Sequence, residues 1–314
     1  MDHTQTILGN VEPDITKRLV SRREAILKGA AVGSSVAAGL AMMSAPIAFA
    51  ALSREAFGQG TPLTVQQVID FALKLEIFEN EFYKAVLGIS AVPAQNAAFA
   101  AVRAMVPAAA IPAIQQIQKH EVEHVAFLQA NGAKNSLNLD GTSFDFTGGR
   151  GSGTGPFAQA TLDVNFLLLV AQGAEDTGVR AYKGQAANLM SNPAVLEAAL
   201  RIHSVEARHA SKIRRLRRMT GATTVKYSGT ITGGGAGAAG AGNVSNPAAG
   251  AVTALGLIYA GEDNVMQGGL NVTTLPNLPS GIDVTAAATE AFDEPLSAGD
   301  VVTIVQPFFI PSLS

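Results

Sequence analysis

The same arrangement of acidic, aromatic and imidazole side chains occurs twice along this chain of 314 residues. In each copy, a Glu is followed seven residues later by a Tyr, and further along a second Glu is followed three residues later by a His. The residues concerned are Glu76, Tyr83, Glu121 and His124 in the first copy, and Glu175, Tyr182, Glu206 and His209 in the second. This repeat predicts a molecule built from two equivalent halves.

Hydrophobic periodicity predicts four long helices, and each of them contains one part of the repeat. They span about 64–87, 111–131, 162–189 and 193–219, with a shorter Ala-rich helix at about 96–105. Thr64 and Gln67 have the spacing of a capping box, while Asn192 and Gly221 are typical of helix ends. A Gly-rich stretch at 134–156 predicts a long crossover between the second and third helices. The pattern therefore favours an all-α four-helix bundle in which helices one and two pair, and helices three and four pair.

The repeated acidic and imidazole residues fall inside the apolar stripes of these helices. Positions i and i+3 share one helix face, so each Glu-x-x-His pair points in one direction. An unpaired buried carboxylate is very costly, and metal ions would offset that cost. The chain has no Cys, so any metal must be held by His, Asp or Glu. Oxygen and imidazole ligands without thiolate suit iron or manganese, and they also admit zinc.

The predicted ligands of two metal ions are Glu76, Glu121, His124, Glu175, Glu206 and His209. Glu121 and Glu206 would bridge the two ions, and each remaining Glu and His pair would complete one of them. Ferritin-like di-iron and di-manganese carboxylate proteins use this ligand set. Five further residues are predicted to support the ligands or to replace one of them: Glu79, Tyr83, Tyr182, His203 and His120. Of these, Glu79 is the alternative to Glu76, and the two tyrosines are expected to pack and form hydrogen bonds rather than to take part in redox chemistry.

Three segments resemble the ferritin-like family that includes the plant and bacterial desiccation-related proteins. Residues 75–83 (LEIFENEFY) are similar to the first helix of that family, and residues 175–182 (EDTGVRAY) to the third. Residues 291–296 (AFDEPL) resemble the tails of its members, so the likeness is good over about 64–221 and loose beyond. The resemblance implies a bundle with a dinuclear metal centre. It implies no settled activity and no catalytic residue.

A rival motif lies in the second helix. Residues 120–124 read His-Glu-x-x-His, the pattern of zinc metalloproteases, in which His120 and His124 would hold zinc and Glu121 would act as general base. This interpretation leaves the second Glu-x-x-His and the two Glu-x6-Tyr pairs unexplained. We therefore keep it as a minor alternative.

The first fifty residues have the features of an export signal. Arg22 and Arg23 precede an uncharged, Ala-rich stretch that ends in a small-x-small pattern at residues 48–50. The segment resembles a twin-arginine signal, which implies the twin-arginine translocase as a partner and a periplasmic or cell-envelope location. The predicted divisions are a signal at 1–50, the bundle at 62–221, and a Gly/Ala-rich link with a mixed, loop-rich extension at 222–314.

The net charge of the chain and its distribution limit the kinds of partner that we expect. The formal net charge of −3 argues against a nucleic-acid partner. Beyond Lys226 the chain has no Lys, Arg or His but seven acidic residues, and we expect this extension to pack on the bundle or on a neighbouring subunit. The leading hypothesis is an exported protein whose metal pair, iron before manganese, reacts with oxygen or peroxide in stress protection. The alternative is a non-catalytic metal-binding or structural protein of the envelope, and in either case a small homo-oligomer is expected.

Overall fold

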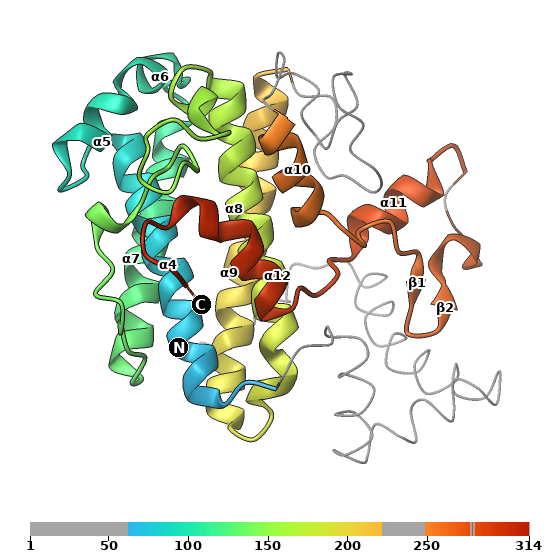
Figure 1. Cartoon of the computed structure of the whole chain (residues 1–314). Coiled ribbons are helices and arrows are strands. Elements are labelled where there is room, and N and C mark those ends of the chain that lie inside the picture. The colour runs from blue at the N-terminus through green and yellow to red at the C-terminus, as the bar shows by residue number, and fades with distance from the viewer. Residues whose placement is uncertain (1–61, 222–248, 277, 279, 314) are drawn as a thin grey trace, which may run out of the picture. The chain divides into compact units, whose positions relative to one another are not determined.

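The computed structural model describes residues 62–221, 249–276, 278 and 280–313. The predicted export signal and most of the Gly/Ala-rich link lie outside the described residues. Within them the chain is mostly helical, and Figure 1 shows the long helices side by side. Among the helices that the structure describes, none combines the length and the apolarity that crossing a bilayer requires.

Four long helices form the bundle that the sequence predicts. They are α4 (Val65–Leu87), α7 (Ile111–Ala130), α8 (Val164–Gln185) and α9 (Pro193–Met219). The main packing pairs are α4 with α7 and α8 with α9, which confirms the predicted pairing of the two halves. Their facing sides bury a continuous apolar core, and this burial rather than local propensity stabilises the bundle.

Local sequence signals set the helix ends. The Thr64 side chain accepts from the Gln67 N–H, and the Gln67 side chain accepts from the Thr64 N–H, so the predicted capping box is present. Asn192 accepts from the Val195 N–H at the start of α9. Two predicted boundaries differ from the structure. The helix expected at 162–189 ends as a 3-10 turn, η3 (Ala186–Leu189), and the helix expected at 96–105 is split into α5 (Pro93–Ala98) and α6 (Ala100–Met105).

The crossover between α7 and α8 is an ordered loop that contains the 3-10 turns η1 (Gly141–Ser143) and η2 (Ala158–Thr161). The buried Asp145 carboxylate organises it by accepting hydrogen bonds from the backbone N–H groups of Thr147 (3.0 Å), Gly151 and Gly153 (both 2.9 Å). The neighbouring Phe144 ring packs on Phe78 of α4, with ring centres 5.8 Å apart. The loop is therefore fixed to the outer face of the first half of the bundle.

The C-terminal extension contains short helices and one small hairpin. Its elements are α10 (Ala249–Ile258), β1 (Met266–Gln267), β2 (Leu270–Asn271), η4 (Val272–Thr274), α11 (Val284–Ala291), α12 (Ala298–Val305) and η5 (Gln306–Phe308). The strands β1 and β2 pair antiparallel, with Met266 opposite Asn271. Within the extension the sequence predicts short helices at about 285–292 and 297–305, which correspond to α11 and α12, but it does not predict α10 or the hairpin.

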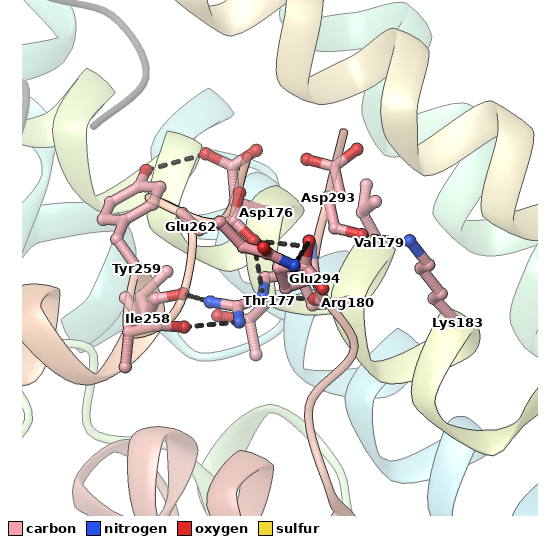
Figure 2. A network of polar contacts seen from close by, with 12 residues as sticks. Asp176, Thr177, Val179, Arg180, Lys183, Ile258, Tyr259, Glu262, Asp293 and Glu294 are labelled. Carbon is pink, nitrogen blue, oxygen red and sulfur yellow. Dashed lines mark hydrogen bonds and ion pairs between the residues drawn. The ribbon is translucent and has the colours of Figure 1, made fainter. Parts of the chain in front are cut away.

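Arg180 of α8 binds the extension to the bundle. Its buried guanidinium donates hydrogen bonds to the backbone carbonyls of Glu294 (2.6 Å), Ala260 (2.7 Å) and Ile258, and it lies 3.2 Å from the carboxylate of Glu262 (Figure 2). Both α10 and α12 also pack on α8. The extension therefore covers α8 of the same chain, which is one of the two placements that the sequence allows.

Candidate metal centre

Six buried side chains meet in the middle of the bundle, and they form two overlapping groups of four. One group is Glu76, Glu121, His124 and Glu206, and the other is Glu121, Glu175, Glu206 and His209. In each group, one potential ligand atom per residue lies within 4.8 Å of all the others. Glu121 and Glu206 belong to both groups, as expected of residues that would bridge two ions. The arrangement is compatible with a metal-binding site.

The two halves of this cluster have matching geometry. His124 directs its Nδ1 toward three carboxylates, at 3.0 Å from Glu76 Oε2, 3.1 Å from Glu121 Oε2 and 3.1 Å from Glu206 Oε1. His209 does the same, with its Nδ1 2.9 Å from Glu121 Oε1, 3.2 Å from Glu175 Oε2 and 3.7 Å from Glu206 Oε2. Each imidazole therefore presents the same ring nitrogen to the shared pair and to one further Glu.

The two repeat tyrosines cross between the halves. The hydroxyl of Tyr83 in α4 donates to Glu175 of α8, and the hydroxyl of Tyr182 in α8 donates to Glu76 Oε1 of α4, at 2.5 Å. Both rings are buried. Because each tyrosine holds the carboxylate of the opposite helix, α4 and α8 fix each other's acidic residue through reciprocal hydrogen bonds.

Burial and mutual repulsion redistribute protons among these groups. Burial raises the pKa of Glu175 to about 7, although His209 opposes the shift. Burial alone would raise the pKa of Glu206 too, but its contacts with His124 and His209 outweigh that effect and bring it to about 2. The pKa values of both histidines are raised despite their burial, because carboxylates surround them. The metal-free cluster is therefore a set of carboxylates sharing protons with two imidazoles.

Several fully buried polar atoms of the cluster lie close to one another, at the distances given above, yet make no hydrogen bond of good geometry. They are Glu121 Oε1, Glu175 Oε2, both carboxylate oxygens of Glu206, and Nδ1 of His209. Buried polar atoms without a partner are rare and costly in native proteins. A divalent cation would satisfy oxygen and imidazole atoms of this kind, so the donor set fits a metal group.

The remaining predicted residues surround the cluster or lie away from it. Glu79 is buried and belongs to neither group; its pKa is raised by burial and by the neighbouring carboxylates of Glu206, Glu175 and Glu121. His203 also belongs to neither group, and its Nδ1 lies 3.0 Å from the carbonyl oxygen of Val179.

His120 is only half-buried, and it is absent from both groups although the zinc-protease interpretation requires it as a ligand. Its Nδ1 lies 2.8 Å from His209 Nε2. Within the part of the chain that the structure describes, Glu121 and His124 therefore share a cluster with residues of the second half of the repeat. They do not share one with His120, as the zinc-protease motif would require.

Two residues near the cluster escape the sequence reasoning. Gly178 of α8 lies directly beside the acidic side chains, since a Cβ at this position would be in ordinary van der Waals contact, at 3.4 Å, with both Glu206 Oε2 and Glu79 Oε1. Gln116 lies one turn before His120, and its side-chain Nε2 is 2.7 Å from His120 Nε2. Only that spacing of four residues on a helix points to Gln116 in the sequence.

Comparison with protein families agrees with the geometry. Residues 64–219 match the model of a family described as ferritin-like domain. The four-helix bundle of this chain, from α4 to α9, is thus a ferritin-like domain. No significant match was found among curated proteins or among solved structures.

Proposed function

We propose that the ferritin-like domain holds two metal ions, bridged by Glu121 and Glu206, with Glu76 and His124 completing one site and Glu175 and His209 the other. The observation that carries the proposal is the pair of four-residue groups that share two carboxylates. The fully buried oxygens that make close contacts but no hydrogen bond of good geometry support it, because a metal ion would satisfy them. Iron is the favoured metal and manganese the alternative, since the site offers oxygen and imidazole but no thiolate.

The chain's own residues orient the site and manage charge. The hydroxyls of Tyr83 and Tyr182 hold the carboxylates of Glu175 and Glu76 in place across the bundle. Burial and the neighbouring carboxylates raise the pKa of Glu79, which lies beside the cluster, and so favour its neutral form while the cluster is metal-free. An iron or manganese pair would supply electrons to bound oxygen or peroxide. Bundle burial excludes bulk water from the six ligating side chains.

We further propose that the protein acts in protection against oxidative stress outside the cytoplasm. Reaction of the proposed metal pair with oxygen or peroxide would provide the protection, and the twin-arginine pattern at residues 22–23 supports export to the periplasm or cell envelope. Replacement of Arg22 and Arg23 by Lys, followed by cell fractionation, tests the export proposal. Retention of the double variant in the cytoplasm is the expected result.

The decisive experiment on the metal centre is elemental analysis of the full chain purified without added metal. We expect about two ions per chain in the wild type and a clear loss in Glu206→Ala, which removes a bridging carboxylate. Glu123→Ala is the matched control, because Glu123 lies on α7 with an exposed side chain paired only loosely, at 3.9 Å, with Lys119. One ion per chain, or equal metal content in both variants, would refute the dinuclear centre.

Turnover separates the two functional hypotheses. Oxygen and peroxide consumption is measured for the iron-loaded and manganese-loaded wild type against Glu206→Ala. Faster consumption by the wild type supports the redox role. If two ions bind but neither oxidant is consumed faster than by the variant, the domain is a non-catalytic metal-binding module.

A further inference from the structure

A short chain of hydrogen-bonding groups leads from His209 to the surface of the bundle. His209 Nε2 lies 2.8 Å from His120 Nδ1, and the two rings have their centres 5.1 Å apart and their planes 11° from parallel. His120 Nε2 in turn lies 2.7 Å from the side-chain Nε2 of Gln116, which is exposed. His120 thus connects a buried ligand candidate with a residue at the solvent boundary.

Only one direction of hydrogen bonding along this chain suits a cation at His209. A neutral imidazole has one N–H and one lone pair, so a lone pair on His209 Nδ1 requires the proton on Nε2. The N–H at His209 Nε2 faces His120 Nδ1, so His120 Nδ1 must be the hydrogen-bond acceptor. The remaining N–H of His120 lies on Nε2 and points to Gln116, whose amide offers an oxygen after a half-turn. The hydrogen bonds then run outward, from His209 through His120 to Gln116.

The other half of the cluster has no such support. His124 presents its Nδ1 to the carboxylates in the same way as His209, but no hydrogen bond reaches its Nε2 from the residues that the structure describes. In the internal repeat, His120 precedes Glu121 and its counterpart before Glu206 is Val205, which has no polar atom in its side chain. The repeat is therefore symmetric in its ligands and asymmetric in the residues that orient the two imidazoles.

We propose that His120 is a positioning residue for His209 and that it makes the two halves of the centre unequal. The half formed by Glu175 and His209 then binds its ion more tightly than the half formed by Glu76 and His124. This inference rests on the proposed dinuclear centre. Partners that orient a metal-ligating His contribute about 10–100-fold in metal affinity, which sets the expected size of the effect.

The test is a calorimetric titration of the full metal-free chain with Mn²⁺. The wild type is expected to bind two ions in two steps of different affinity. His120→Phe keeps a flat ring beside His209 but removes the acceptor, and it should weaken the tighter step about 10–100-fold while leaving the other step unchanged. His120→Asn replaces the Nδ1 acceptor with a side-chain oxygen and should restore most of the loss. Glu197→Gln, an exposed residue of α9 paired with Arg201, is the control and should titrate like the wild type.

A second measurement needs no substitution. In the zinc-loaded wild type, which is diamagnetic, nitrogen-15 NMR of the histidines should show the His209 proton on Nε2, hydrogen-bonded and slow to exchange. A proton on His209 Nδ1 in this spectrum would overturn the proposed role of His120. In the calorimetric titration, the same role is overturned if His120→Phe binds both ions like the wild type, or if it weakens both steps equally. These outcomes leave the dinuclear centre itself standing. A wild type that binds fewer than two ions overturns the dinuclear centre as well.

Discussion

Replacement of Gly184 by Ala should detach part of the C-terminal extension from α8. A Cβ at this position would lie 1.9 Å from the backbone carbonyl oxygen of Leu296, so the two segments must separate by about 1 Å or more. Backbone atoms cannot move aside as the end of a side chain can. The shift would break the hydrogen bond from the Leu296 N–H to the carbonyl oxygen of Arg180, now 3.1 Å long.

The expected cost to docking follows from two contributions. Overpacking against a fixed neighbour costs about 1–3 kcal/mol. The lost hydrogen bond adds about 1 kcal/mol, whereas the better helix propensity of Ala stabilises α8 equally with and without the docked extension and does not enter. The net loss is about 3 kcal/mol, which corresponds to roughly a 150-fold larger undocked fraction.

Amide hydrogen exchange of the full chain measures this fraction directly, because the Leu296 amide exchanges when the extension opens. We expect exchange of Leu296 to be at least about 150-fold faster in Gly184→Ala than in the wild type, with α4 and α7 unaffected. Gly173→Ala is the matched control in the same helix. Its Cβ would meet only side-chain ends, Ile258 Cδ1 at 3.0 Å and Leu255 Cδ2 at 3.8 Å, which can move aside more easily than backbone. Unchanged protection of Leu296 in Gly184→Ala would refute the close approach.

Three more predictions concern other parts of the molecule. Arg180→Met should lower the free energy of unfolding by about 3–5 kcal/mol in urea titrations, because it removes a buried charge paired with Glu262, and a loss below 1 kcal/mol would contradict this role. The pKa of Asp145 is held below its usual 3.8 by hydrogen bonds of the crossover loop, which outweigh its burial, so its contribution to stability is present above pH 3.8 and is lost as the pH falls further. Asp145→Asn should therefore show less acid dependence of unfolding below pH 3.8, and an identical pH profile would count against the loop's anchoring. Tyr83→Phe and Tyr182→Phe should each weaken Mn²⁺ binding by about 10-fold, since each hydroxyl orients one carboxylate, and unchanged binding in either variant would contradict this role of its hydroxyl.

Most of the bundle could be predicted because its helices have one apolar face each. The stripes of α4, α7, α8 and α9 are regular, and their ends have recognisable caps, so type and approximate boundaries follow from periodicity. The helix α10 lacks this signal: its sequence, AGAVTALGLI, is apolar on all sides and has no stripe to detect. The hairpin of β1 and β2 is only two residues long in each strand, which is too short for an alternating pattern.

The ligand candidates could be predicted because the same pattern occurs in both halves of the repeat. The contacts of the side chains that hold these candidates in place could not be predicted. Tyr83 and Tyr182 stand seven residues after an acidic residue of their own helix, and that spacing does not reveal that each hydroxyl crosses to the other helix. The contact between His120 and His209 joins residues 89 positions apart, on helices of different halves. Such contacts depend on how the halves are rotated against each other, and that rotation is set by packing rather than by local pattern.

The two faces of α8 explain why charged residues stand in the middle of a buried helix. Glu175 and Tyr182 face the cluster, whereas Asp176 and Arg180 face Tyr259 and the carbonyls of the extension (Figure 2). Buried charges are tolerated only when they are paired, and without the extension the second face would lie open to water. The extension therefore completes the burial of α8, the helix that carries the proposed ligand Glu175 and one of the two supporting tyrosines, Tyr182. Because one rigid helix carries both faces, the position of Glu175 depends on the docking of a segment more than eighty residues further along the chain.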